Sequence, residues 1–231
     1  MGFTPVWLLP LLVLLCACKP EERRPESVGR SSDFTNPAPP KRAGTEDQRP
    51  TIVCFGDSLT AGFGVDPGKS YPDLLQQELD RRGYRYRVVN LGVSDDTTQD
   101  GLDRLSLVLS EKPRIVLLEF GANDGLRGQP VSNSENNLSQ MIDGLQKAGA
   151  QVILAGITLP PNYGPDYIGK FDAMFQALAA RYKTPLIPFL LAGVAGNSNL
   201  MQRDRLHPNA EGTRLVVRNV TRTLEPLLQR E

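Results

Sequence analysis

The stretch Thr51–Gly64, TIVCFGDSLTAGFG, decides how this chain of 231 residues is organised. Thr51 to Phe55 is a short run of apolar and β-branched residues that predicts a buried strand, and Gly56 ends it. Ser58 follows at the carboxyl end of that strand, where open α/β sheets bind their ligands. A serine there reacts only if a base takes its proton and nearby donors stabilise an oxyanion, so the rest of the chain must supply both.

The number of histidines in the sequence limits which residue can act as an imidazole base for Ser58. His207, in the segment DRLHP, is the only histidine of the sequence, so any imidazole base must be this residue. Asp204 precedes it by three residues and is close enough to bond the far ring nitrogen and fix the tautomer. The sequence therefore predicts that Ser58, His207 and Asp204 meet in the fold.

Between these two ends the chain alternates short apolar runs with helical patterns. We expect strands at residues 51–55, 87–91, 114–119, 151–157 and 185–187, and helices at residues 71–82, 98–111, 134–148, 167–182 and 210–228. Strands that alternate with helices predict a parallel sheet covered by helices on both faces.

Two further residues follow predicted strands in the same way as Ser58. Gly92 comes after the second strand, and its backbone N–H can approach a ligand closely because it has no side chain. Asn123 comes after the third strand and carries an amide that can donate to an oxyanion without bringing charge. Taken singly, Gly92 is also compatible with a plain turn glycine and Asn123 with an Asx turn.

The ordered segments GDSL (56–59), NLG (90–92), GAND (121–124) and DRLH (204–207) resemble the GDSL/SGNH hydrolase superfamily. The longer strings GDSLTAGFGV, GANDGLRG, LPPNYG and HPNAEG are similar to its bacterial thioesterase, arylesterase and lysophospholipase branch. The resemblance implies a three-layer α/β/α sandwich over residues 51–231, with a five-stranded parallel sheet in the flavodoxin-like order 2-1-3-4-5. It also implies a catalytic triad of Ser58, Asp204 and His207. The implied oxyanion hole is the N–H groups of Ser58 and Gly92 with the side chain of Asn123.

Two positions depart from that branch. Asp95 and Arg205 each stand where the branch often has glycine. We expect Arg205 to point to solvent rather than to pair with Asp204 and weaken its hold on His207.

The predicted reaction is transfer of an acyl group from an ester or thioester to Ser58 and then to water, with no metal and no organic cofactor. Loops after the third, fourth and fifth strands, at residues 125–130, 159–169 and 189–199, should wall the site. The segment 189–194, FLLAGV, is apolar enough either to line an acyl pocket or to continue the fifth strand inside the core. These features favour small-molecule esters or thioesters of medium or long acyl chains, and aryl esters, over sugar acetates.

Three other functions remain open from the sequence. A carbohydrate O-acetyl esterase would use the same triad, a non-catalytic lipoprotein would use the fold for binding, and the strand–turn at Ser58 would also suit a flavin or phosphate. Nucleic acid is not an expected partner, because 26 Lys and Arg balance 26 Asp and Glu.

The N-terminal segment predicts export. Residues 1–18 form a signal peptide with a short apolar stretch, and Leu15 to Cys18 resemble a bacterial lipoprotein cleavage box with Cys18 as the lipidated residue. An ordinary cleaved signal without lipid is the alternative. Residues 19–50 are polar and rich in proline and predict a disordered tether. We therefore expect the protein on the periplasmic side of the cell envelope, as an outer-membrane lipoprotein held through a lipid anchor.

Overall fold

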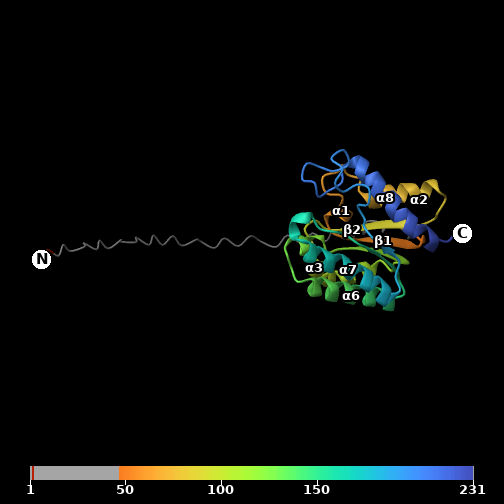
Figure 1. The fold of residues 1–231 in the computed structure, drawn as a ribbon. Coiled ribbons are helices and arrows are strands. Elements are labelled where there is room, and N and C mark those ends of the chain that lie inside the picture. Colours follow the sequence, from red (N-terminus) through yellow and green to blue (C-terminus); the bar gives the residue numbers. More distant parts are fainter. Residues whose placement is uncertain (1, 3–46, 231) are drawn as a thin grey trace, which may run out of the picture. The chain divides into compact units, whose positions relative to one another are not determined.

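The computed structural model describes Gly2 and residues 47–230. The rest of the signal peptide, with Cys18, and most of the predicted tether lie outside these residues. The described domain is a parallel sheet between two layers of helices (Figure 1). Its strands are β1 (Thr51–Gly56), β2 (Arg87–Gly92), β3 (Ile115–Glu119), β4 (Gln151–Ala155) and β5 (Leu186–Ile187). The α-helices are α1 (Ser58–Ala61), α2 (Tyr71–Arg81), α3 (Thr98–Asp103), α4 (Leu105–Ser110), α5 (Ala122–Leu126), α6 (Val131–Lys147), α7 (Pro165–Tyr182) and α8 (Ala210–Leu224), and the 3-10 helices are η1 (Pro161–Tyr163) and η2 (Glu225–Leu227).

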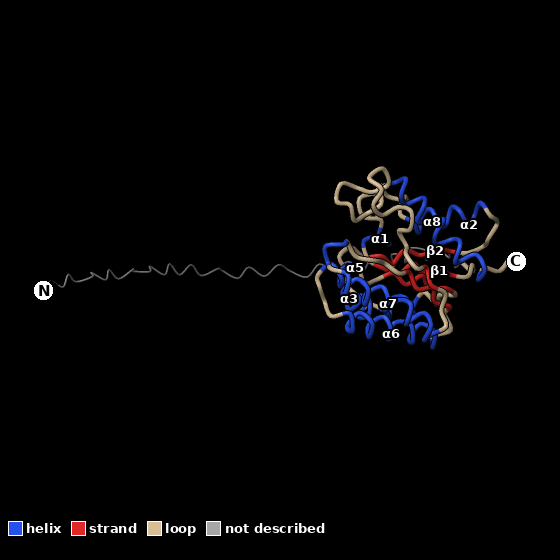
Figure 2. Tube along the Cα trace, viewed as in Figure 1, coloured by secondary structure: helices blue, strands red, loops and turns tan. Residues whose placement is uncertain are grey.

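The strands lie in the order β2-β1-β3-β4-β5 and all pair in parallel, which confirms the predicted sheet. Helices α2 and α8 cover one face, and α3, α6 and α7 cover the other, with the strands between the two layers (Figure 2). The registers place Gly56 beside Gly92 on one side and Glu119 on the other. The carboxyl ends of β1, β2 and β3 therefore meet at one edge of the sheet, the edge that carries the site.

Hydrophobic burial explains why these segments take their places. Strands β1 and β3 are buried along their whole length because they lie inside the sheet, whereas β2 is only partly covered at its edge. Helix α6 turns one apolar stripe inward, as its spacing predicts, and the stripe is fully buried: Leu138, Met141, Ile142 and Leu145.

The predicted helix at residues 98–111 is wrong as a single element. It is divided into α3 and α4 at Arg104, whose backbone is not helical. The Arg104 guanidinium donates to Asp96 at 2.6 Å and to the carbonyls of Leu91 at 2.7 Å and Gly56 at 2.9 Å. The interruption thus falls on the residue that ties these helices to the ends of β1 and β2.

Other boundaries differ from the prediction by a few residues. Strand β4 ends at Ala155 instead of residue 157, and β5 begins at Leu186. Helix α8 gives way to η2 at Glu225, next to Pro226, which has no N–H to continue the helical hydrogen bonds. None of these differences moves a predicted site residue to another edge of the sheet.

Candidate functional site

Ser58 is placed by the turn between β1 and α1. Asp57 caps α1, and its Oδ1 accepts a hydrogen bond of 3.0 Å from the N–H of Leu59. Ser58 is the first residue of that helix, so its own N–H has no intrahelical acceptor, and it has no other partner among residues 47–230. The loop therefore presents both the hydroxyl and a free N–H of Ser58 at the edge of the sheet.

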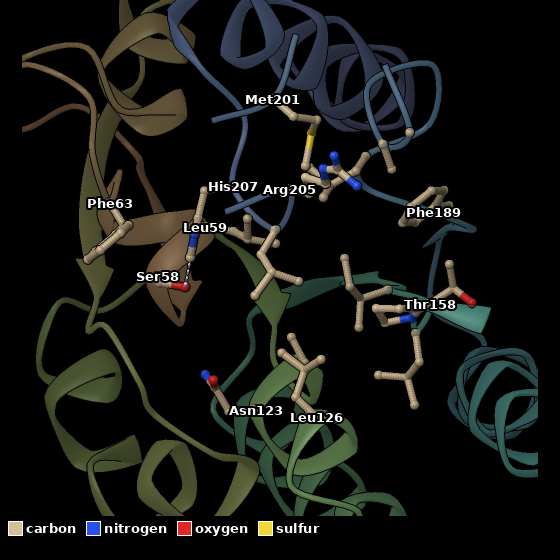
Figure 3. Close-up of a pocket in the computed structure, with 18 of the residues that line it drawn as sticks. Ser58, Leu59, Phe63, Asn123, Leu126, Thr158, Phe189, Met201, Arg205 and His207 are labelled. Atoms are coloured by element: carbon tan, nitrogen blue, oxygen red, sulfur yellow. Dashed lines mark hydrogen bonds between the residues drawn. The ribbon is translucent and has the colours of Figure 1, made fainter. Parts of the chain in front are cut away.

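The three residues predicted to act together do meet. Ser58 Oγ lies 2.8 Å from His207 Nε2, and His207 Nδ1 lies 2.7 Å from Asp204 Oδ2 (Figure 3 shows the serine and the histidine). Asp204 Oδ1 also accepts the N–H groups of Leu206 at 2.9 Å and His207 at 3.1 Å. Because an ionised carboxylate only accepts, the His207 proton resides on Nδ1, which leaves Nε2 free to accept the serine proton.

These bonds set the protonation of Asp204. Partial burial pushes its pKa upward, but the hydrogen bonds from the His207 ring and from the N–H groups of Leu206 and His207 outweigh burial and lower it overall. Asp204 therefore stays ionised beside His207.

Two residues that sequence reasoning missed hold His207 in place. The ring of Phe63 lies against His207 with the centroids 4.6 Å apart, although Phe63 is half exposed. The backbone N–H of Gln202 donates to the His207 carbonyl at 2.8 Å, and its side-chain amide donates to the carbonyl of Phe63 at 2.7 Å. A glutamine in a polar loop carries no sequence signal of such a role.

Gly92 does not occupy the predicted place in the oxyanion hole. Its N–H donates to Asn90 Oδ1 at 2.9 Å, and it is not among the residues that line the cavity around Ser58. It is glycine for another reason, because an added Cβ would lie 2.2 Å from the backbone nitrogen of Ala61 in α1. The correction is that Gly92 lets α1 pack closely on β2 while its donor is already used.

Asp95 occupies the place beside Ser58 that was predicted for Gly92 in the oxyanion hole. It lines the cavity with Ser58, and its N–H has no partner within the described part of the chain. Its φ of 69° lies in the left-handed region that glycine adopts without strain, so the backbone at this position suits glycine better than aspartate. The Arg127 guanidinium holds this turn by donating to the Asp95 carbonyl at 3.0 Å.

Asn123 lies where the sequence predicts, in the second position of α5, and it lines the same cavity as Ser58. One N–H of its side-chain amide donates to the carbonyl of Asp96 at 2.9 Å. The amide has two N–H groups, so this bond orients it and leaves the second free for a ligand.

A cavity of about 580 Å³ opens beside the serine (Figure 3). The three predicted wall loops all contribute, with Leu126 from the first, Leu159, Pro160 and Pro161 from the second, and Phe189, Leu191, Ala195 and Gly196 from the third. The segment 189–194 does not continue β5, so that alternative is wrong. Phe189 and Leu191 line the cavity, as the other alternative predicts, while Leu190 and Val194 are buried in the core. The wall is therefore largely apolar.

Two carboxyl groups outside the Ser58–His207–Asp204 set, those of Asp57 and Glu119, are buried close to Ser58. Glu119 Oε2 accepts from the Thr60 hydroxyl at 2.9 Å and the Asp57 N–H at 3.3 Å, whereas Glu119 Oε1 and Asp57 Oδ2 are buried without a partner. Burial, with the neighbouring Asp57, raises the pKa of Glu119 well above its usual range. A proton on Glu119 satisfies the pair by allowing one carboxyl to donate to the other. The signal for this pair was the one charged residue in the apolar strand β3.

Within residues 47–230, no group of three or more His, Cys, Asp or Glu side chains is arranged to hold a metal ion. The helices described by the structure include none with the length and apolar character needed to cross a membrane.

Comparisons with known proteins identify the family to which this chain is similar. The model of the GDSL-like Lipase/Acylhydrolase family matches residues 54–215. The chain is 45% identical over 179 residues to Esterase TesA of Pseudomonas aeruginosa, covering 77% of this chain and 89% of that protein. It is 36% identical over 182 residues to the Thioesterase 1/protease 1/lysophospholipase L1 of Escherichia coli, with 78% and 86% covered.

A solved structure agrees in both fold and sequence. The psychrotrophic esterase EstA from Pseudoalteromonas sp., inhibited by monoethylphosphonate, matches with a TM-score of 0.73 and 35% identity, over 77% of this chain and 97% of that one. The family model begins within β1, the strand that leads to Ser58, and includes the loop that carries Asp204 and His207. With its sheet order, its four sequence segments and these relatives in agreement, the chain belongs to the GDSL-like lipase/acylhydrolase family.

Proposed function

We propose that this carboxylic ester hydrolase works through an acyl-enzyme formed on Ser58, with His207 as the base and Asp204 as the residue that orients it. The observation that carries the proposal is the continuous chain of contacts from Ser58 Oγ to His207 Nε2 at 2.8 Å and from His207 Nδ1 to Asp204 at 2.7 Å. This chain lies at the wall of an apolar cavity of about 580 Å³.

The geometry supports the following sequence of steps. His207 Nε2 takes the proton of Ser58 as its oxygen attacks the substrate carbonyl, and Asp204 stabilises the charged ring that forms. His207 then gives that proton to the leaving alcohol or thiol, which departs and leaves the acyl group on Ser58. His207 then takes a proton from water, which attacks the acyl-serine, and gives this proton to the departing Ser58 oxygen as the carboxylic acid is released.

The oxyanion formed in each step needs donors near Ser58. We assign them to the N–H of Ser58, the N–H of Asp95 and the side-chain amide of Asn123. All three residues line the cavity, and the two backbone N–H groups have no other partner among the described residues. Such preorganised donors act without reorganisation during the reaction.

The cavity supports esters and thioesters of medium or long acyl chains and aryl esters. Leu126, Leu159, Phe189 and Leu191 offer an apolar wall that removes acyl carbons from water. An acetylated sugar would bury hydroxyl groups against the same wall without hydrogen-bond partners, at a free-energy cost. The cavity therefore favours acyl and aryl esters over a carbohydrate acetyl esterase.

The purified domain should be tested on p-nitrophenyl esters of increasing chain length, acyl-CoAs, lysophospholipids and acetylated xylan. We expect hydrolysis of acyl esters, and expect Ser58→Ala to lose activity and labelling by a fluorophosphonate by several orders of magnitude. Ser110→Ala changes an exposed serine outside the cavity and serves as the control. Undiminished labelling of the Ser58 variant would overturn the assignment, and turnover confined to acetylated xylan would overturn the substrate class.

We also propose that the mature protein is held to the outer membrane, on its periplasmic side, by a lipid on Cys18. The sequence of the segment 15–18, LCAC, supports this proposal. Cells that express Cys18→Ser should release the protein to the soluble periplasmic fraction or leave it unprocessed. Identical mature masses and soluble fractionation of both forms would contradict the anchor.

A further inference from the structure

Arg205 lines the reactive cavity although it is a charged residue in a largely apolar wall. It lies beside Met201, across the cavity from Asn123 and Leu126 (Figure 3). Its backbone φ is 60°, and its N–H donates to the Gln202 carbonyl at 3.1 Å. The turn thus holds Arg205 in the left-handed conformation that glycine adopts without strain, and places a long cationic side chain at the cavity rim.

The guanidinium of Arg205 has no hydrogen-bond or ion-pair partner in the part of the chain that the structure describes. Its neighbour Asp204 is engaged by the His207 ring and two backbone N–H groups, and forms no ion pair with Arg205. By contrast, Arg104 near the same edge of the sheet is paired with Asp96 at 2.6 Å. Arg205 is therefore free to bind a ligand.

The other charged side chain on this cavity, apart from the His207–Asp204 relay, is that of Asp95. Asp95 belongs to the loop after β2. The next residue of that loop, Asp96, accepts a hydrogen bond from the Asn123 side chain through its carbonyl, so Asp95 lies on the side of the cavity that carries Asn123. Arg205 comes from the opposite loop, which carries His207. The cavity is thus electrostatically uneven, with its fixed positive charge on the side of Met201 and His207.

We propose that Arg205 is a specificity-determining residue that binds an anionic group, a phosphate or carboxylate, on the ester or thioester whose carbonyl reacts at Ser58. A guanidinium can donate two parallel hydrogen bonds to such an oxyanion, which a neutral wall cannot do. The inference rests on the proposed hydrolytic function, and it states which substrates that function prefers. It requires no change in the chemistry at Ser58.

Matched substrate pairs test the charge alone. On the acyl side, mono-p-nitrophenyl adipate is compared with p-nitrophenyl hexanoate. On the leaving-group side, butyryl-CoA is compared with the butyryl thioester of N-acetylcysteamine. The measured quantity is the ratio of kcat/KM for the anionic substrate to kcat/KM for its neutral partner. The pair whose ratio depends on Arg205 locates the anion relative to the scissile bond.

We expect Arg205→Gln and Arg205→Gly to lower this ratio roughly five- to tenfold in at least one pair, mainly through KM, and Arg205→Lys to lower it less. Arg203→Gln is the matched control, because Arg203 is an exposed arginine of the same loop outside the cavity. Added salt should lower the wild-type ratio more than that of Arg205→Gln.

Equal ratios in wild type and both neutral variants, for both pairs, would overturn the proposal. So would an equal drop in Arg203→Gln, which would indicate only a long-range charge effect. Activity of the wild type on the neutral esters tests the hydrolytic function separately, so the two ideas fail by different results.

Discussion

The side-chain amide of Gln202 donates to the backbone carbonyl of Phe63 at 2.7 Å and so joins the loop of His207 to the loop of Ser58. The same amide reaches the carbonyl of Pro208 at 3.0 Å, and the backbone of Gln202 holds the His207 carbonyl at 2.8 Å. Two segments about 140 residues apart in sequence are therefore fastened beside the reacting atoms. Gln202 touches no reacting atom and is a positioning residue.

Replacing Gln202 by Leu should lower kcat by about tenfold or more with a smaller change in KM, since small misplacement of reacting groups is costly. Fluorophosphonate labelling should slow in parallel. Gln146→Leu is a matched control, because Gln146 also donates to a backbone carbonyl, that of Tyr182, but lies outside the cavity. If both variants lose thermal stability alike and Gln202→Leu keeps its kcat, Gln202 supports only the fold.

Replacing Asn123 by Ala should lower kcat by about 10²- to 10³-fold, or about 2.7–4 kcal/mol of transition-state stabilisation, because one oxyanion donor is lost. KM should change little, since the oxyanion exists only after attack. Steady-state kinetics beside Asn133→Ala, an exposed position on α6, provide the comparison. A loss that appears only in KM would assign Asn123 to substrate binding instead.

Replacing Asp204 by Asn should lower kcat by at least 10²-fold at neutral pH, but less than loss of His207. If the Asn oxygen keeps the N–H groups of Leu206 and His207, its NH₂ faces His207 Nδ1 and favours the tautomer with the proton on Nε2, which cannot accept from Ser58. Kinetics of Asp204→Asn and His207→Ala at neutral pH test this order. Near wild-type activity of either variant would contradict the relay.

Asp204 also sets a stability limit in acid. Its pKa in the folded state is lowered, so its contribution to stability is complete above the unfolded value of 3.8 and is lost as the pH falls through the lower folded value. Urea unfolding of wild type should show this loss in that acidic range, and Asp204→Asn should show a smaller one, because the pKa values of Asp47, Glu78 and Asp100 are lowered as well and are unchanged in the variant. Equal losses in the two proteins would contradict the contribution of Asp204.

Replacing Glu119 by Gln should flatten the dependence of stability on pH. Because the folded pKa of Glu119 is raised, its contribution is present below the unfolded value of 4.5 and is lost as the pH rises toward the folded one. Glutamine stays neutral, accepts from Thr60 and the Asp57 N–H, and can donate to Asp57 Oδ2. Urea unfolding at pH 5 to 9 measures the slope, and Glu119→Ala, expected to lose about 1–3 kcal/mol, controls for lost hydrogen bonds. Parallel slopes for wild type and Glu119→Gln would contradict a protonated Glu119.

Some features of this protein followed from the sequence because they depend on local pattern or on counting. The apolar runs of β1 and β3, with helices between them, predicted a covered parallel sheet, since each run must be buried on both faces. The single histidine left no other imidazole for Ser58. The spacing of Asp204 and His207 placed both in one loop, so their contact needed little from the remainder of the chain.

Other features were decided only by the tertiary structure, because they depend on which donors and side chains are already used by distant segments. Nothing near Gly92 in sequence shows that α1 packs on it or that Asn90 takes its N–H, and nothing near Asp95 shows that its free N–H lies on the cavity instead. The contact of Gln202 with Phe63 has the same origin. A hydrogen-bond donor serves one geometry at a time, and the packing of segments far apart in the chain determines which geometry that is.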